Sequence, residues 1–331
     1  PFLPKKIEEG RYEDIRECIG CNICYTGDQL GVPIRCTQNP TMGEEWRRGW
    51  HPEYVPEKKS ESSVLVIGAG PAGLEAAHAL GKRGYKVMLS EARNELGGRV
   101  AQESRLPSLS EWIRVKDYRE QQFLKLPNVE VYLDSHLSAE DALLTEVDHI
   151  VIATGAKWRA DGFGRNNAIC IEKLGASEQI FTPDDIMVGR LPKGRVIVFD
   201  DDYYYMGPVI AEMLQKGGCQ VTFVSTSNMA CSFGSYTSEQ PSAQKALINA
   251  GVQMIFSQNI QAYDGENIEL SCMYTERAST LKADAIVMVT ARLPVDELYY
   301  QLQDLIENGK AGSTQSIRRI GDCEAPALIA S

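Results

Sequence analysis

Hydrophobic and polar residues follow two repeating patterns along most of this chain, one typical of buried strands and one typical of helices. Residues 64–68 (VLVIG) form a short apolar, β-branched run, which predicts a buried strand. A helix is predicted next, from PAGLEAAHALGKRG and ending at Gly84, and then a second strand at 86–91. The alternation continues with a helix at 108–125, a strand at 129–133, a helix at 139–147 and a strand at 149–156.

A second series of the same kind begins near Arg195. It predicts strands at 195–200, 220–226 and 252–257, with a helix between each pair, then a meander and a strand at 285–291. The final segment, 317–326, is expected to return to the first sheet. We therefore predict an α/β fold with two doubly wound dinucleotide-binding-type domains, the second inserted in the first, preceded by a small Cys-rich segment.

The N-terminal residues do not follow either pattern. Residues 1–51 have little apolar periodicity and are rich in Cys, Gly, Pro and Arg, which is typical of a segment that folds around a metal. The predicted organisation is a metal-binding segment at 1–51, a polar linker at 52–62, a first domain at 63–165 and 285–331, and a second domain at 166–284. Because the chain begins PFLPKK without an initiator Met, we expect it to be a piece of a longer protein.

Composition excludes several classes of function. The net charge of −11 argues against nucleic acid and against an anionic membrane surface, and no apolar run reaches the length of a membrane span. The chain has nine cysteines, an odd number at irregular spacing, which does not suggest a secreted disulfide framework. With no signal peptide, the expected location is the cytoplasm, where scattered cysteines such as Cys170 and Cys323 are small buried hydrophobes.

Four of the cysteines are close together: Cys18, Cys21, Cys24 and Cys36. The first three are three residues apart and the fourth stands alone, a spacing that lets one loop hold three corners of a cubic cluster while a distant cysteine closes it. Structural zinc more often uses two separated C-x₂-C pairs. The spacing favours a [4Fe–4S] cluster over zinc, and a disulfide is the least favoured interpretation.

A glycine-rich turn follows the first predicted strand. Gly68, Gly70 and Gly73 occupy the G-x-G-x-x-G positions between a strand and a helix, the context in which this motif indicates a dinucleotide site. Glu91 ends the second strand, where a carboxylate accepts hydrogen bonds from ribose hydroxyls. The residues predicted to bind the nucleotide are Gly68, Gly70, Pro71, Ala72, Gly73, Glu91, Gly98, Arg99, Thr154, Gly155 and Asp322.

The second series lacks such a turn. After the strand at 195–200 the chain reads DDDYYYMG, from Asp200 to Gly207, where three carboxylates and three tyrosines would obstruct a pyrophosphate. We predict that this domain does not bind NAD(P). Neither series contains a C-x₂-C redox pair, which excludes thioredoxin-reductase chemistry.

Several segments together resemble one family. PFLPKKIEEGR is similar to the end of the flavin barrel in old-yellow-enzyme-type proteins. The run from ECIGCNIC through IRCTQNP and GEEWRRGWHPE to VLVIGAGPAGLEAA resembles the C-terminal part of the trimethylamine, dimethylamine and histamine dehydrogenases. GGRVAQES, YRE, IATGA and GDCEAP extend the resemblance over essentially the whole chain, and DDDYYYMG and VMVTARLP are most similar to histamine dehydrogenase.

The resemblance implies an electron-transfer role. In such enzymes an N-terminal barrel with covalently attached FMN oxidises the amine, and electrons pass through one [4Fe–4S] cluster to an electron-transferring flavoprotein. By position, Cys18, Cys21, Cys24 and Cys36 match the cluster ligands, and Gly68, Gly70, Gly73 and Glu91 match a bound ADP. The full-length protein is expected to be a homodimer. Since the barrel is absent, this chain alone is not expected to oxidise an amine, and no catalytic residue is assigned.

Two alternatives stay open at this point. One is a dienoyl-CoA-reductase-like oxidoreductase, which would need FAD in the first domain and NADPH in the second. The other is a non-enzymatic module that docks a partner flavoprotein, for which the run Trp46–His51 could serve, although packing on the missing barrel explains that run better. The turn at 200–207 counts against the reductase.

Overall fold

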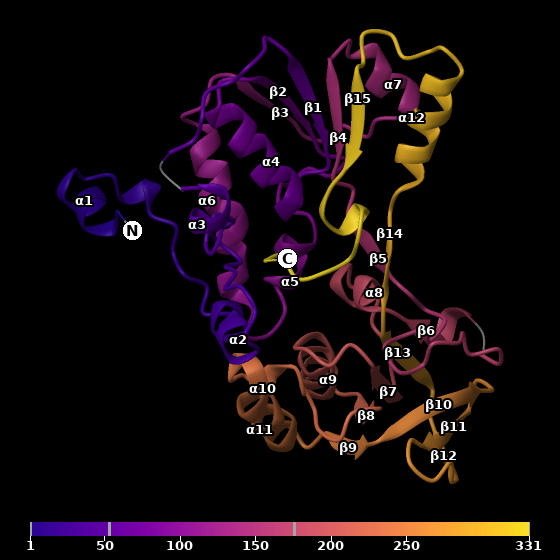
Figure 1. The fold of residues 1–331 in the computed structure, drawn as a ribbon. Coiled ribbons are helices and arrows are strands. Elements are labelled where there is room, and N and C mark those ends of the chain that lie inside the picture. Colours follow the sequence, from indigo (N-terminus) through magenta and orange to yellow (C-terminus); the bar gives the residue numbers. More distant parts are fainter. Residues whose placement is uncertain (1, 52–53, 175–176, 331) are drawn as a thin grey trace. The chain divides into compact units, whose positions relative to one another are not determined.

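Each of the two predicted series of strands forms a five-stranded parallel sheet in the computed structural model (Figure 1). The structure describes residues 2–51, 54–174 and 177–330. The chain divides into two compact units. The first unit runs up to Ser104 and includes Glu111–Ala156 and the residues from Pro294 onward, and the second contains Arg105–Ser110 and Lys157–Leu293. The predicted α/β class and parallel sheets are confirmed.

The sheet of the first unit has the order β15-β4-β1-β2-β3. Its strands are β1 (Ser63–Ile67), β2 (Lys86–Ser90), β3 (Val129–Tyr132), β4 (His149–Ile152) and β15 (Ser316–Arg319). The helices and 3₁₀ turns of this unit are α1 (Leu3–Glu8), η1 (Tyr12–Asp14), α2 (Ile23–Gln29), α3 (Glu45–Arg48), α4 (Pro71–Lys82), α5 (Arg99–Glu103), α6 (Arg114–Phe123), α7 (Ala139–Leu144), α12 (Glu297–Glu307) and η4 (Gly321–Cys323).

Alternate residues of β1 face opposite layers of this unit. Val64 and Val66 pack with the apolar side of α4 and with Phe123 of α6, whereas Leu65 and Ile67 pack with residues of α7 and α12. Because both faces of the sheet are covered (Figure 1), the strand is apolar throughout rather than alternating. The carboxyl edge of the sheet stays available for a site.

The sheet of the second unit has the order β6-β13-β7-β8-β9. Its strands are β6 (Ile180–Phe181), β7 (Arg195–Asp200), β8 (Gln220–Ser225), β9 (Gln253–Phe256) and β13 (Ala285–Val289), and its helices and 3₁₀ turn are η3 (Ser177–Gln179), α8 (Pro183–Met187), α9 (Met206–Lys216), α10 (Gly234–Thr237) and α11 (Gln240–Ala250). The predicted meander is an antiparallel sheet of β10 (Gln258–Tyr263), β11 (Asn267–Cys272) and β12 (Ala278–Lys282). Strands β5 (Ala156–Trp158) and β14 (Arg292–Pro294) pair where the chain passes between units.

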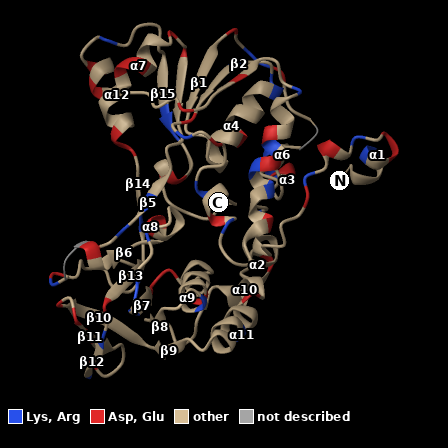
Figure 2. Ribbon diagram, turned by 180° about the vertical axis from the view of Figure 1, so that it is seen from behind, with Lys and Arg blue, Asp and Glu red and all other residues tan. Residues whose placement is uncertain are grey.

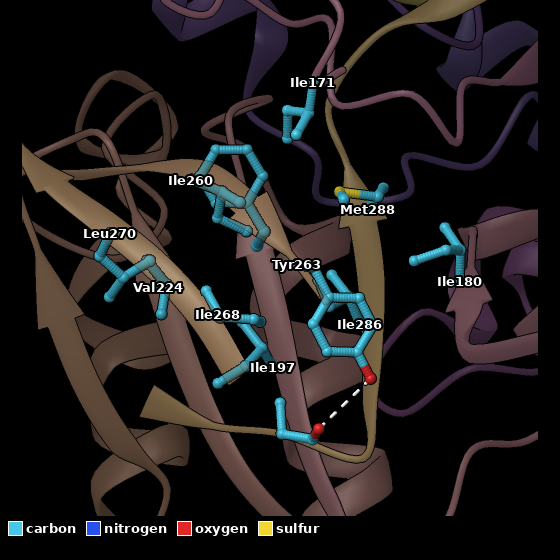
Figure 3. Packing of buried hydrophobic residues seen from close by; sticks show 12 residues of the cluster. Ile171, Ile180, Ile197, Val224, Ile260, Tyr263, Ile268, Leu270, Ile286 and Met288 are labelled. Atoms are coloured by element: carbon cyan, nitrogen blue, oxygen red, sulfur yellow. Dashed lines mark hydrogen bonds between the residues drawn. The ribbon is translucent and has the colours of Figure 1, made fainter. Parts of the chain in front are cut away.

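The meander and the parallel sheet of the second unit share one core. Ile260, Ile268 and Leu270 of the meander pack with Ile197 and Ile286 of the sheet (Figure 3). Tyr263 is fully buried among them, and its hydroxyl donates to the backbone carbonyl of Ala283 at 3.3 Å. This bond satisfies a polar group that burial would otherwise leave without a partner.

Two predicted boundaries are wrong. The predicted strand at 285–291 is placed in the first domain, but β13 (Ala285–Val289) pairs with β7 and β6 of the second sheet, and residues from Lys157 also belong to the second unit. An apolar strand fits the interior of either sheet, so pattern alone does not decide its partner. The helix expected at 108–125 begins at Arg114, because Ser108 has a φ of 64° and a 3₁₀ turn, η2 (Ser110–Ile113), precedes α6.

The cysteine-rich segment belongs to the first unit and is not a separate body. Of the predicted linker 52–62, residues 52 and 53 lie outside the part of the chain that the structure describes, as do residues 1, 175, 176 and 331 of the predicted domains. In the described part of the chain, no helix is long and apolar enough to cross a membrane.

Candidate functional site

The turn between β1 and α4 requires glycine at two positions. Gly68 has a φ of 98°, and a Cβ there would lie 2.5 Å from the carbonyl oxygen of Ala153. A Cβ at Gly73 would lie 1.9 Å from the carbonyl oxygen of Gly68, so the first turn of α4 packs directly on the end of β1. These are the roles that the motif assigns to its first and third glycines.

Gly70 differs from both because open space lies beside it. It precedes α4 with a φ of −71°, and no described atom lies within 4 Å of the position that a Cβ would take. Pro71 and Ala72 then begin the helix, whose first backbone N–H groups have no partner within the helix. Open space at a helix N-terminus suits a pyrophosphate, which approaches the backbone closely and carries negative charge.

Glu91 ties the glycine turn to the end of the second strand. Its side chain is buried, and its carboxylate accepts hydrogen bonds from the backbone N–H groups of Ala69 at 2.8 Å and Arg93 at 3.0 Å. Each carboxylate oxygen has a second lone pair with which it can accept from a ribose hydroxyl. Glu91 therefore has a structural role in shaping the turn, which the sequence did not indicate.

A second glycine pair lies against the first turn. The N–H of Gly97 donates to the carbonyl of Ala69 at 2.8 Å, and a Cβ at Gly98 would lie 3.0 Å from the Cα of Gly70. The guanidinium of Arg99, at the start of α5, donates to the carbonyl of Ala156. The structure thus places the predicted Gly98 directly over Gly70 and directs Arg99 towards the backbone that follows β4.

The ends of β4 and β15 complete the same edge of the sheet. Thr154 donates through its hydroxyl to the carbonyl of Val295 at 2.5 Å, and Gly155 follows with a φ of 79°. Asp322 accepts from the N–H of Ala327 at 3.0 Å. Gly321, which the sequence analysis did not include, would place a Cβ 2.5 Å from that of Ala72, so η4 packs against the start of α4.

The four clustered cysteines lie in the segment that leads into and past α2. Cys24 is in the first turn of α2, Cys18 is exposed, and the other three are partly exposed. Among the residues that the structure describes, no group of three or more His, Cys, Asp or Glu side chains could hold a metal ion. The four cysteine ligands therefore remain a prediction from the sequence.

The hydrogen bonds around the sulfurs suit thiolate ligands. The N–H of Gly20 donates to the Sγ of Cys18 at 3.3 Å, and the N–H of Asn39 donates to the Sγ of Cys36 at 3.4 Å. The Sγ of Cys21 is 3.2 Å from the hydroxyl oxygen of Thr37. Burial raises the pKa of the Cys21 thiol, and the neighbouring Cys36 and Cys18 raise it further.

A polar face of α6 holds the cysteine segment. Charged residues of both signs follow one another along this helix (Figure 2). Gln122 donates to the carbonyl of Glu13 at 3.0 Å, and Lys125 pairs with Glu13 and Asp14 at 2.7 and 2.9 Å. Hydrogen bonds and ion pairs from this helix, and from Lys125 just beyond its end, therefore help to dock the segment.

A buried group of charges continues this contact to α4. Arg119 of α6 is 2% exposed and pairs with Glu75 of α4 at 2.7 Å, while Arg16 lies 3.6 Å from the same carboxylate. Burial by itself would raise the pKa of Glu75, but Arg119, His78 and Arg16 lower it to about 2. The sequence carries no signal for this group, because nothing near Arg119 in the sequence indicates that its side chain is buried.

The corresponding turn of the second unit is filled by its own side chains. Asp200 is fully buried at the end of β7, and a Cβ at Gly207, in the first turn of α9, would lie 2.8 Å from its carboxyl carbon. Burial raises the pKa of Asp200 well above its ordinary value, and the charge of Asp202 adds to the effect. Asp201 accepts from the N–H groups of Asn166 and Asn167 at 2.9 and 3.2 Å.

The three tyrosines of this run make contacts with other residues of the second unit. Tyr204 is buried and packs edge-on against Tyr205 and Phe233, with ring centroids 4.6 and 5.0 Å apart. The hydroxyl oxygen of Tyr203 lies 2.7 Å from the hydroxyl oxygen of Thr226. The carboxyl of Asp200 lies against the first turn of α9, and Tyr205 is the N-cap residue of that helix.

An intact nucleotide turn, an acidic residue at the end of the second strand and a degenerate second unit define the class of nucleotide-binding α/β oxidoreductases. Residues 66–134 match the NAD(P)-binding Rossmann-like domain family, and residues 181–285 match the OYE-like second alpha/beta domain family.

The chain is similar over its whole length to known amine-converting enzymes. It is 36% identical to a dimethylamine dehydrogenase from Hyphomicrobium sp. (strain x), covering 100% of this chain and 48% of that protein. The structure of a histamine dehydrogenase from Rhizobium sp. 4-9 matches with a TM-score of 0.97 at 47% identity, covering 100% of this chain and 51% of the other. A 6-hydroxypseudooxynicotine amine oxidase from Pseudomonas geniculata N1 matches with a TM-score of 0.93 at 46% identity, covering 100% and 49%.

The chain is therefore a relative of the dimethylamine and histamine dehydrogenases, similar over its whole length to about half of each of them. The resemblance inferred from the sequence motifs is confirmed. The chain spans about half the length of the relatives that it matches.

Proposed function

We propose that this chain is the electron-transfer and nucleotide-binding part of an amine dehydrogenase. The observation that carries the proposal is the docking of the cysteine segment, through α6 and α4, on the same unit that contains the intact glycine turn. The relatives are about twice as long as this chain, so we place oxidation of a small amine at an FMN in the remaining half of the protein.

Each residue group has a distinct part in this proposal. Cys18, Cys21, Cys24 and Cys36 would hold a [4Fe–4S] cluster, which when bound supplies a one-electron store between the flavin and an external acceptor. The N–H groups of Gly20 and Asn39 orient the sulfurs of Cys18 and Cys36. We propose an electron-transferring flavoprotein as the acceptor and a homodimer as the full-length assembly.

The nucleotide in the first unit is proposed to be ADP, held by the turn at Gly68–Gly73 and by Glu91. The occupied turn at Asp200 supports this over the reductase alternative, because NADPH would need the space that the carboxyl of Asp200 fills. The matches to amine-converting enzymes, which cover the whole of this chain, also favour the amine dehydrogenase over the reductase. ADP has no flavin or nicotinamide ring, so it would not transfer electrons itself. As a ligand that binds only the folded chain, it would stabilise the fold.

The cluster is tested by the visible spectrum and metal content of the anaerobically purified chain. We expect a broad absorption that dithionite bleaches and about four iron atoms per chain. Cys36→Ser should lose this absorption and most of the iron, whereas Cys170→Ser should retain both, because Cys170 lies in the second unit, where, contrary to the expectation from the sequence, it is exposed. A colourless protein that contains zinc would contradict the cluster, and extracted FAD in place of ADP would favour the reductase.

The nucleotide site is tested by Gly70→Ala. The new methyl group enters the open space beside Gly70, so the fold should be retained while ADP binds at least about tenfold more weakly, because the pyrophosphate needs that space. Calorimetric titration of nucleotide-free protein with ADP measures the change, and thermal unfolding checks the fold. Gly217→Ala adds the same methyl group at a residue of ordinary φ in the second unit and should bind ADP normally. Unchanged affinity of Gly70→Ala would place the nucleotide elsewhere.

A further inference from the structure

One peptide group links two arginines, Arg119, which is buried, and Arg16, which is partly buried, to a cysteine sulfur. The peptide between Gln38 and Asn39 donates through the N–H of Asn39 to the Sγ of Cys36 at 3.4 Å. The carbonyl oxygen of the same peptide, that of Gln38, accepts from two guanidinium groups. Arg16 donates to it at 2.7 Å and Arg119 at 3.3 Å.

Both guanidinium groups are held in place by further contacts. Arg119 donates to Glu75 at 2.7 Å and to the carbonyl of Val115 at 2.6 Å, both within the first unit. The guanidinium of Arg16 stacks on the ring of Tyr118 at 4.7 Å and lies near the same glutamate. Gln38 itself is 3% exposed, so solvent does not compete for its carbonyl.

The side chain of Gln38 fixes the peptide in the same orientation. Its amide donates to the carbonyl of Glu17 at 3.1 Å, and its Oε1 accepts from Arg119 at 3.3 Å. The chain segments before Cys18 and after Cys36 are thereby joined through one residue. Rotation of the Gln38–Asn39 peptide would break several of these hydrogen bonds at once.

The charges of this group do not cancel. Arg16 and Arg119 carry two positive charges because guanidinium groups stay protonated, and Glu75 carries one negative charge. Burial lowers the pKa of His78, the imidazole beside Glu75, which therefore adds no charge at neutral pH. One net positive charge remains buried beside the Gln38 carbonyl.

Hydrogen bonds in a chain polarise one another, most strongly in a medium of low dielectric constant. A carbonyl that accepts from two cations makes the N–H of its own peptide a stronger donor. Hydrogen bonds to cluster sulfurs stabilise the reduced, more negative state and so raise the reduction potential. The two arginines can therefore act on the sulfur of Cys36 without contacting it.

We propose that Arg16 and Arg119 are positioning residues for Cys36, which orient and polarise the Gln38–Asn39 peptide and thereby raise the reduction potential of the cluster that this cysteine holds. This inference rests on the proposed function. It assigns the group of Arg16, Glu75 and Arg119 a role in electron transfer, in addition to its contribution to the stability of the fold.

The test is a redox titration of the purified chain, followed by electron paramagnetic resonance. Arg16→Met removes the shorter of the two guanidinium hydrogen bonds and leaves the pair of Arg119 and Glu75 intact, so the fold is retained. We expect the ratio of reduced to oxidised cluster at a given potential to fall about tenfold, which corresponds to a midpoint about 59 mV lower for one electron. Arg16→Lys, which keeps a cationic donor, should restore part of the shift.

Arg114→Met is the matched control. Arg114 is an exposed arginine of α6 that lies 3.4 Å from the carbonyl oxygen of Cys18 and pairs with Glu17, so the variant removes the same charge close to the cysteines. Because solvent screens an exposed charge, its midpoint should stay near that of the wild type.

The outcomes separate this inference from the proposed function. A wild-type protein without an iron–sulfur signal would overturn both. A normal cluster whose midpoint does not change in Arg16→Met would overturn the inference alone, as would an equal shift in Arg114→Met, which would indicate a general effect of charge.

Discussion

Replacing Gly73 by Ala is expected to lower the free energy of unfolding by about 3 kcal/mol or more and to abolish nucleotide binding. A Cβ at this position would lie 1.9 Å from the carbonyl oxygen of Gly68, a backbone atom, and a Cβ is fixed to the helix backbone, so neither atom can rotate away. The strand and helix must therefore separate, which disturbs the turn and the core residues beneath it, such as Leu74. Urea unfolding followed by circular dichroism measures the loss.

Gly70→Ala provides the matched comparison, since it adds the same methyl group three residues earlier, where open space is present. Its stability should stay close to that of the wild type. If Gly73→Ala unfolded at the same urea concentration as Gly70→Ala, the tight packing of α4 on β1 would be disproved.

Replacing Glu75 by Gln is expected to destabilise the chain by about 3 to 5 kcal/mol at neutral pH, because it leaves a buried arginine without its carboxylate. Arg119 has a side chain that is 3% exposed and pairs with Glu75 at 2.7 Å. An ion pair on the surface of α6, the helix that carries Arg119, serves as the control. Glu120 is 49% exposed in its pair with Lys116, so Glu120→Gln should change stability by less than about 1 kcal/mol.

The effect of Glu75→Gln should depend on pH in a defined direction. The folded chain lowers the pKa of Glu75 from 4.5 to about 2, so the carboxylate stabilises the fold fully above its unfolded pKa, and this contribution is lost as the pH falls towards 2. The difference between the wild type and Glu75→Gln should therefore be constant above about pH 5 and shrink below it. Unfolding curves between pH 7 and pH 3 measure this, and a difference that grew with acidity would contradict the assignment.

The contrast between the two units shows why a sequence motif was sufficient in one place and not in another. In the first unit, Gly68 and Gly73 are required by backbone contacts within one strand–turn–helix element, so the local sequence carries the whole signal. In the second unit, the acidic run predicted a turn that does not suit a pyrophosphate. The sequence did not indicate that the carboxyl of Asp200 is fully buried against the first turn of α9.

By itself the sequence determined the α/β class, the two series of strands and helices, the nucleotide turn and the family, because each depends on periodicity or on residues close together along the chain. The tertiary structure decided that β13 joins the second sheet, that Glu91 holds the turn through Ala69, and that Arg16, Glu75 and Arg119 meet at Gln38. These contacts join residues far apart in the sequence, and an apolar strand or a charged side chain carries no local mark of the partner that it meets.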